Sequence, residues 1–314
     1  MEFIVNVPKV FRPDPCFEYP RYNTITFEEY FYRYFLEHQP ITKRKYLPIL
    51  WSVFYYTRHY RNDGTQDLQK YLDQLDPSQS YFTICAYDGG TFEKTSHLDL
   101  KVFSSIGDTV SMNWNTYKGN VGDRAIPLTL TPAPNINLNR ERDVLAGFVG
   151  ARTSPERESI WNMLSNEPDF EVRESIVSPV CSFEKMDTDK WATVGYEGFK
   201  DLMERNVFAL CPRGSSPTTF RICESLQYGC VPVYVSDHFW FPWSNPKDPS
   251  DHGMFDQIGI TCTTKEIPDL PRRLRSMSKS RINDYLQAGR ELYQDYFSSE
   301  GCAARIVEEV NYNG

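Results

Sequence analysis

Residues 208–235 read Phe208-Ala-Leu-Cys-Pro-Arg-Gly-Ser-Ser-Pro-Thr-Thr-Phe-Arg-Ile-Cys-Glu-Ser-Leu-Gln-Tyr-Gly-Cys-Val-Pro-Val-Tyr-Val235. This order predicts a strand, a turn rich in hydroxyl groups, a short helix and a second strand. Gly229 is typical of a residue that ends a helix, and residues 231–235 have the composition of a short buried strand. A turn that joins a strand to the start of a helix favours a site for a negatively charged ligand.

The predicted helix begins at Pro217 with Ser216 as its N-cap, because proline suits the first helical position and serine accepts a free N–H group. The hydroxyls of Ser215, Ser216 and Thr218 and the N–H groups of Thr218 and Thr219 would then converge on one place. The positive end of the helix dipole points to the same place. We therefore predict that these residues bind a phosphate group.

Arg221 and Glu224 lie three residues apart and share one face of the predicted helix. They would put a cation beside the phosphates and a carboxylate within reach of two ribose hydroxyls. The whole stretch resembles the donor-binding signature of exostosin-type glycosyltransferases, which runs Leu-Cys-Pro-x-Gly, Ser/Thr-x-Arg, Glu-Ala-Leu and Gly-Cys-Val-Pro-Val, followed by an Asp. Ser225 replaces the usual Ala, and Thr-Phe-Arg stands where Ser-Pro-Arg is common, but neither change removes a functional group.

Two further segments extend the resemblance. Residues 145–157, Leu-Ala-Gly-Phe-Val-Gly-Ala-Arg-Thr-Ser-Pro-Glu-Arg, are similar to the opening strand of the family's donor domain. This likeness makes Arg152 and Arg157 candidates for binding the donor diphosphate. Residues 81–90, Tyr-Phe-Thr-Ile-Cys-Ala-Tyr-Asp-Gly-Gly, resemble the family's Phe-Phe-Val-x-x-His-Asp-Trp-Gly and place Asp88 at the end of a strand.

The resemblance implies an α/β fold of the GT-B type, in which two Rossmann-like domains face each other across a cleft. We expect an acceptor-side domain over residues 1–139, a donor-binding domain over 140–280 and C-terminal helices over 281–314 that return to the first domain. The resemblance also implies an inverting enzyme with a UDP-linked donor, and the favoured sugar is xylose or another neutral sugar. Asp88 would remove the proton from a hydroxyl of a glycan acceptor, with Asp123 as the next carboxylate to consider.

The amino-acid composition of the chain limits the kinds of molecule that it is expected to bind. The chain has 314 residues, enough for two domains, and its 34 basic and 42 acidic side chains give a net charge of −8. This balance gives no electrostatic case for nucleic acid or for an anionic membrane, and no window is apolar enough for membrane insertion.

Eight cysteines without a Cys-x-x-Cys pair, and the absence of any Asn-x-Ser/Thr acceptor, favour reduced thiols and a cytoplasmic location. The likeness to compact anchorless enzymes of large algal DNA viruses would make this the host cytoplasm, whereas a trimmed cellular enzyme would act in the Golgi lumen.

Apolar periodicity along the chain predicts alternating strands and helices. A passage rich in Pro and Asn, residues 126–140, is the expected linker between the two domains. The predicted helices cover residues 27–37, 66–75, 155–164, 196–204 and much of 281–311. The predicted strands outside the signature cover residues 49–56, 81–86, 144–150 and 170–177.

Two other functions stay open, besides a hydrolase with paired carboxylates, for which no pair stands out among the 42 acidic side chains. Asp187-Thr-Asp189 is an Asp-x-Asp pair of the kind that binds a metal in other glycosyltransferases, although it lies in a hydrophilic run typical of a solvated loop. A glycan-binding or partner-stabilising protein without activity is the second alternative. Because arginines and a helix N-terminus already supply positive charge, we expect catalysis without a metal or another cofactor.

Overall fold

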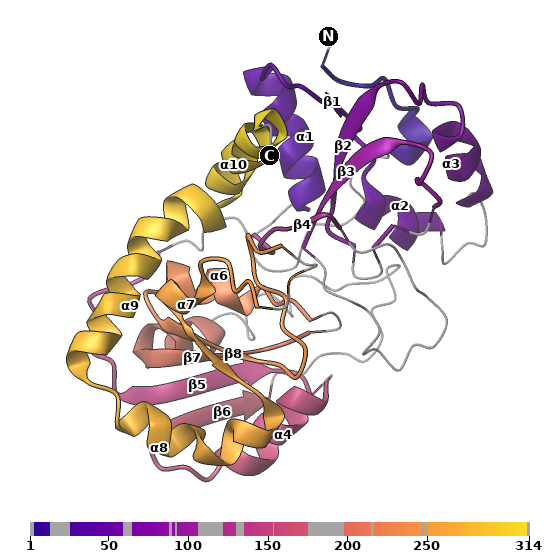
Figure 1. Ribbon diagram of the computed structural model, residues 1–314. Helices are drawn as coiled ribbons and strands as arrows, with labels where there is room; N and C mark the ends of the chain where they lie inside the picture. Colours follow the sequence, from indigo (N-terminus) through magenta and orange to yellow (C-terminus); the bar gives the residue numbers. More distant parts are fainter. Residues whose placement is uncertain are drawn as a thin grey trace.

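The computed structural model describes residues 3–12, 26–58, 65–87, 90–91, 93–105, 122–129, 135–152, 154–174, 198–214, 217–245, 248 and 250–312. Two parallel sheets organise this part of the chain (Figure 1). The first sheet has the order β1-β2-β3-β4, with strands Lys45–Tyr46, Ser80–Cys85, Asp99–Ser104 and Arg124–Ala125. The second has the order β6-β5-β7-β8-β9, with β5 Val144–Gly150, β6 Phe170–Glu174, β7 Asn206–Pro212, β8 Val231–Val235 and β9 Ile260–Cys262.

Helices cover both faces of the first sheet. Phe82 and Ile84 of β2 pack on one face with Phe31 of α1 (Phe27–His38). On the other face, Cys85 and Val102 pack with side chains of α2 (Trp51–Arg58) and α3 (Thr65–Leu72). A short 3-10 helix, η1 (Lys9–Phe11), contributes Phe11 to this second face. Burial of both faces is the arrangement that parallel sheets require.

Helix α2 contradicts the predicted strand over residues 49–56. The side chains described for this helix, those of residues 51–55, are all buried, and Trp51, Phe54 and Tyr55 are each 0% exposed. A fully apolar run cannot distinguish a buried helix from a buried strand by its periodicity. The Glu28 carboxylate also accepts the Ser52 N–H at 2.9 Å, and this contact satisfies one of the free donors at the start of α2.

The second sheet also forms the middle of three layers. Ala209 and Cys211 of β7 face a cluster with α6 (Arg221–Gln227), α7 (Phe255–Ile258) and the helix over residues 198–205. Phe208 and Leu210 point to the opposite face. That face is covered by α4 (Pro155–Leu164), η4 (Thr264–Asp269) and α8 (Leu270–Arg275). The two sheets with their helices confirm the predicted α/β fold of the GT-B type.

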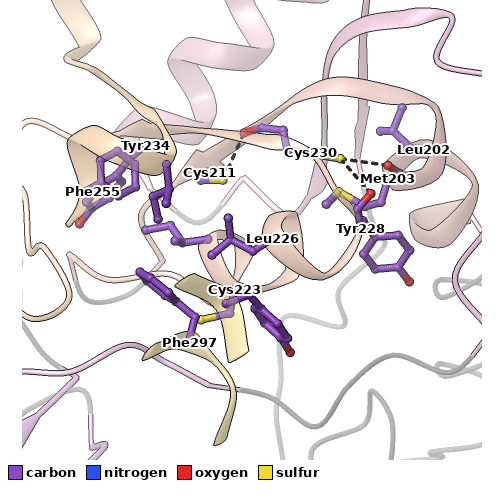
Figure 2. Close-up of a cluster of buried hydrophobic side chains, with 14 of the residues drawn as sticks. Leu202, Met203, Cys211, Cys223, Leu226, Tyr228, Cys230, Tyr234, Phe255 and Phe297 are labelled. Carbon is purple, nitrogen blue, oxygen red and sulfur yellow. Dashed lines mark hydrogen bonds between the residues drawn. The ribbon is translucent and has the colours of Figure 1, made fainter. Parts of the chain in front are cut away.

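Cysteine thiols belong to the core of the second domain (Figure 2). Cys211 donates to the Ala209 carbonyl at 3.2 Å, and Cys230 donates to the Met203 carbonyl at 3.1 Å. Burial raises the pKa of Cys211 to about 12. The thiol of Cys223 also lies in this cluster and has a raised pKa because it is buried. These thiols are therefore packing groups rather than nucleophiles.

The C-terminal helices connect the second domain to the first. Helix α9 (Lys279–Leu292) lies along the second domain, a π-helical turn follows over Tyr293–Phe297, and α10 (Ser299–Asn311) lies beside α1 (Figure 1). Glu309 of α10 pairs with Lys101 at 3.1 Å and with Arg124 at 2.9 Å. The last helix therefore packs as part of the first domain.

Trp243 provides a second connection between the two halves. Its backbone has a φ of 65°, and its N–H donates to the Ala125 carbonyl of β4 at 2.9 Å. Its indole Nε1 donates to the Tyr296 carbonyl at 2.9 Å, and its ring packs with the core of the first domain. The segment after β8 is therefore attached to the first sheet and to the π-helical turn.

Within the described residues, no helix has both the length and the apolar character that a membrane span needs.

Candidate functional site

The strand order places a topological switch point between β5 and β7, because β6 lies beyond β5 on one side and β8 lies beyond β7 on the other. Pairing between β5 and β7 runs to Gly147 and Ala209, whereas pairing between β7 and β8 continues to Pro212 and Val235. The strands β5 and β7 therefore diverge toward their carboxyl ends. In open α/β sheets, ligands bind outside the carboxyl ends of the strands at such a point.

Arg157 crosses the switch point. It lies in the first turn of α4, where the Ser154 hydroxyl caps the helix by accepting the Arg157 N–H. Its Nη1 donates to the Ala151 carbonyl, just beyond β5, at 3.1 Å. Its Nε donates to the Arg213 carbonyl, just beyond β7, at 3.0 Å. The structure thus brings Arg157 to the place where a ligand of this sheet would bind.

Arg221 fills the space between the diverging strands. Its Nη2 donates to the Val149 carbonyl of β5 at 2.9 Å, and its Nε donates to Glu224 Oε2 at 2.9 Å. The side chains of Arg221 and Glu224 are only 8% and 2% exposed. The Nη1 group is buried and makes no hydrogen bond with any described residue. The predicted phosphate and ribose residues are therefore each other's partners in this structure.

Arg213 was not singled out from the sequence, although it lies inside the signature. It directly follows β7, and its Nε donates to Glu156 Oε1 at 2.6 Å. The two side chains are 9% and 3% exposed. Position was the signal that could have found it, because a basic residue directly after a central strand falls at the ligand-binding edge of a parallel sheet.

Arg152 takes a different position from Arg157. Its guanidinium lies 3.9 Å from the centre of the Trp161 ring. Its Nη1 lies 3.6 Å from Glu158 and its Nη2 lies 3.3 Å from Glu174, at the end of β6. The structure therefore places Arg152 on the β6 side of β5 and does not join it to Arg157, Arg213 and Arg221.

The turn of the signature differs from the prediction. Helix α6 begins at Arg221, four residues after Pro217, and its N-cap Phe220 makes no side-chain capping bond. The Thr219 hydroxyl accepts the Arg221 N–H at 3.3 Å, and Thr218 is buried with its carbonyl accepting from Gly214 at 3.3 Å. These contacts hold the residues after Pro217 in a turn, so the helix begins later in the chain than predicted. Ser215 and Ser216 lie outside the described residues.

The buried Tyr234 holds this turn in place through hydrogen bonds. The Tyr234 hydroxyl of β8 donates to the Pro217 carbonyl at 2.6 Å and accepts the Trp240 N–H at 3.1 Å. Burial raises the pKa of Tyr234, so the hydroxyl keeps its proton for this contact. The residues around Pro217 are thereby attached to the end of β8.

The end of α6 agrees with the prediction. Gly229 has a φ of 62°, the left-handed conformation of a residue that follows a helix. Its N–H donates to Leu226 at 3.2 Å, and the next N–H, from Cys230, donates to Ser225 at 2.8 Å. These two bonds form a Schellman motif and confirm the predicted C-cap.

The structure describes part of the predicted acceptor side, around the end of β2. Asp88, the predicted base, lies outside the described residues. Glu28 of α1 is fully buried: its Oε1 accepts the N–H of Ala86, the residue that follows β2, at 2.6 Å and the Ser52 hydroxyl at 3.0 Å. Burial raises the pKa of Glu28 to about 7, while the donated hydrogen bonds lower it. Asp123 accepts the Val102 N–H at 2.9 Å and so supports the pairing of β3 with β4.

Asp187 and Asp189 also lie outside the described residues. Within the described part of the chain, no group of three or more His, Cys, Asp or Glu side chains is arranged to hold a metal ion. The alternative of an Asp-x-Asp metal site therefore stays a prediction.

Comparison with known proteins identifies the family. The profile of the exostosin GT47 domain matches residues 3–277. The chain belongs to the exostosin GT47 family. This family of glycosyltransferases agrees with the resemblance carried by the signature and by the two further segments.

Several curated relatives match part of the chain. It is 28% identical over 119 residues to an exostosin-1 homologue of Caenorhabditis elegans, which covers 38% of this chain and 28% of that protein. It is 31% identical over 136 residues to a probable glucuronosyltransferase of Oryza sativa subsp. japonica, which covers 43% of this chain and 26% of that protein. A probable beta-1,4-xylosyltransferase of Arabidopsis thaliana is 28% identical over 121 residues, which cover 38% of this chain and 23% of that protein. The matches thus span about a quarter of the length of these relatives.

Solved structures give more distant likenesses. TarM superposes with a TM-score of 0.40 and 13% identity over 89% of this chain and 57% of that one. A glycosyltransferase from Rickettsia africae superposes with a TM-score of 0.38 and 9% identity over 92% of this chain and 81% of that one. The fold assignment rests on the two parallel sheets.

Proposed function

We propose that this member of the exostosin family is an inverting glycosyltransferase that moves a sugar from a UDP-linked donor to a hydroxyl of a glycan acceptor. The observation that carries the proposal is the pair of arginines at the switch point of the second sheet. Arg157 crosses from the end of β5 to the end of β7, and Arg221 fills the space between these strands. Guanidinium groups match the geometry of phosphate oxygens and keep their charge at all physiological pH values.

The donor diphosphate would bind where these arginines lie. Positive charge stabilises the departing UDP most when the sugar leaves, because negative charge grows on the diphosphate at that moment. Thr218 and Thr219 lie in the adjacent turn, and Ser215 and Ser216 complete the predicted set of phosphate donors. We also propose that Arg152 contributes to binding of the diphosphate and that Glu224 binds the donor ribose.

The acceptor would bind on the side of the first sheet. Inversion needs a base that removes the proton of the attacking hydroxyl, and Asp88 is the proposed base. It follows β2 by three residues, close in the chain to the backbone that Glu28 holds. Two domains that supply the donor site and the base separately agree with a reaction between two substrates.

The identity of the sugar is proposed from the relatives. A probable xylosyltransferase and a probable glucuronosyltransferase are both among them, and a UDP-linked donor of xylose or another neutral sugar remains favoured. The predicted cytoplasmic location and the likeness to viral enzymes are part of the same proposal. Buried thiols such as Cys211 and Cys223 agree with a reducing compartment.

Calorimetry with UDP, GDP and ADP, followed by a panel of UDP-sugars, tests the donor assignment. We expect UDP to bind more tightly than the other two nucleotides and one UDP-sugar to be hydrolysed slowly without an acceptor. Proton NMR of the transferred sugar then reports whether the anomeric centre is inverted. A folded protein that binds none of these nucleotides would contradict the proposal and favour the non-catalytic glycan-binding alternative. Retention of the anomeric configuration would contradict only the inverting mechanism.

A further inference from the structure

We infer that Arg213 is a binding residue for the donor diphosphate and that Glu156 is the residue that positions it. The inference rests on the proposed function, because it assumes a nucleoside diphosphate at the switch point. Neither residue was assigned a role from the sequence. Both follow from the way α4 and the end of β7 meet in the folded chain.

Arg213 has the right place and the right free donors. It directly follows β7, and its carbonyl oxygen accepts from Arg157, so its backbone is part of the crossing between β5 and β7. Its Nε is occupied by Glu156, but its Nη1 and Nη2 make no hydrogen bond with the part of the chain that the structure describes. Two parallel N–H groups on one edge of a guanidinium are what a phosphate binds in bidentate fashion.

Glu156 controls which edge of Arg213 is available. Its Oε1 lies 2.6 Å from Arg213 Nε, and both side chains are more than nine-tenths buried. A carboxylate on the Nε side leaves the opposite Nη1 and Nη2 edge to face a ligand. The second carboxylate oxygen, Oε2, is buried and has no hydrogen-bond partner among the described residues. A buried ion pair that served only the fold would need hydrogen bonds for its remaining polar atoms. The Glu156–Arg213 pair leaves Oε2 without such a bond among the described residues.

The balance of charges at the switch point also supports a role for Arg213 in binding the diphosphate. Arg157, Arg213 and Arg221 bring three positive charges to the switch point, while the buried Glu156 and Glu224 bring two negative charges. The two carboxylates compensate most of this charge in the absence of a ligand, so the arginines stay folded into place. An incoming diphosphate then meets groups that are already oriented, and binding spends little free energy on ordering them.

The test compares UDP with UMP and uridine, using binding to the whole chain in solution. In the Arg213→Lys variant, we expect UDP affinity to fall by about 10- to 100-fold, the range for a charge-assisted hydrogen bond. Uridine affinity should stay unchanged, because it lacks the phosphates. A variant that binds UDP as tightly as the wild type would overturn the role of Arg213.

Arg142→Lys is the matched control. Arg142 also donates to backbone carbonyls in this domain, with Nη2 at 2.6 Å from the Tyr228 oxygen, but it lies near the amino end of β7. This variant should lose stability without changing the ratio of UDP to uridine affinity. An equal loss of UDP affinity in Arg142→Lys would show that the effect of Arg213→Lys is a general consequence of destabilisation, and it would overturn the inference.

The positioning role of Glu156 is tested separately with Glu156→Gln. We expect a loss of UDP affinity of about 3- to 10-fold, and we expect this loss to disappear when Arg213 is already replaced by Lys, because contacting residues are energetically coupled. Additive losses in the double variant would contradict positioning through Arg213. Should Arg213→Lys not fold, unchanged UDP affinity in Glu156→Gln alone would still contradict the inference. A wild-type chain that binds no UDP would instead refute the proposed function, so the two failures are distinguishable.

Discussion

Arg221 carries its charge in the interior because Glu224 compensates it, and this pairing changes what a substitution does. A surface arginine could be removed without cost to the fold, but the side chains of this pair are 8% and 2% exposed. Glu224 would stay behind as a buried carboxylate that has lost its cation. The same residue therefore serves the fold and the proposed donor site.

We expect Arg221→Ala to lower the free energy of unfolding by about 3–5 kcal/mol, the usual result of breaking a buried ion pair. UDP affinity should fall by about 1.5–3 kcal/mol, the range for hydrogen bonds to charged groups. Urea unfolding and calorimetry with UDP measure the two effects. Arg272→Ala is the control, because the Arg272 side chain is 77% exposed and should matter to neither quantity. Normal UDP binding in folded Arg221→Ala would remove this residue from the donor site.

Asp88→Asn separates a base from a residue that only shapes a turn. The amide keeps the size of the side chain but cannot take a proton, so kcat for transfer should fall by about 10²- to 10⁴-fold. The dissociation constant of the UDP-sugar should barely change, because the proposed base belongs to the acceptor side. Steady-state kinetics and calorimetry on both proteins decide. A variant that keeps more than about a tenth of the wild-type kcat would move the base elsewhere.

At the scale of elements, Glu28 joins three pieces of the first domain. Its carboxylate comes from α1 and accepts from Ser52 at the start of α2 and from Ala86 at the end of β2. The predicted strand over residues 49–56 becomes a helix in this setting, where the carboxylate accepts the Ser52 N–H in the first turn of α2. A contact between residues far apart in the chain thus decides the secondary structure of a segment.

The raised pKa of Glu28 predicts how stability depends on pH. The folded-state pKa is about 7 and the ordinary value is 4.5, so the folded protein holds this proton more tightly than the unfolded chain. The contribution to stability is fully present below pH 4.5 and is lost as the pH rises through about 7, with a size of about 3 kcal/mol. Glu28→Gln should therefore show a flatter stability profile than the wild type between about pH 5 and pH 8. Urea titrations across this range measure it, and parallel profiles would contradict the assignment.

At the scale of the whole molecule, the two domains are connected by α10 and by Trp243 as well as by the linker. Trp243 is 6% exposed and contacts β4 and the π-helical turn. All the arginines of the proposed donor site belong to the second domain. Donor binding should therefore depend on the second domain alone, whereas transfer needs both domains in register.

Trp243→Ala tests this separation. Loss of a large buried aromatic side chain should cost about 3–5 kcal/mol of stability. At a temperature where the variant is folded, we expect UDP affinity close to that of the wild type and a reduced kcat for transfer. Calorimetry and transfer assays on the same preparation give the comparison. Equal losses of binding and transfer would show that Trp243 supports the donor domain itself.

Transfer is expected to survive EDTA, because arginine side chains supply positive charge at the proposed diphosphate site. The assay compares kcat before and after chelation and after addition of Mn²⁺. Loss of activity that Mn²⁺ restores, and that Asp187→Ala abolishes again, would favour the metal-dependent alternative.

The sequence by itself determined the features that depend on near neighbours. The predicted strand over residues 144–150 and the predicted helix over 155–164 coincide with β5 and α4, and Gly229 ends α6 as predicted. Apolar alternation, a serine cap and a glycine with positive φ act over a few residues, so they can be read from the chain directly. The family signature adds the GT-B fold and the part of the chain that holds the proposed donor site.

Only the tertiary structure decided the features that depend on distant residues. Helix α2, the turn that precedes α6 and the pairing of Arg213 with Glu156 each involve contacts between residues that are far apart in the chain. Arg152 and Arg157 look equivalent in the sequence, yet one stacks on Trp161 and the other crosses the switch point. The physical reason is that burial and ion pairing depend on distances in space, which separation along the chain does not specify.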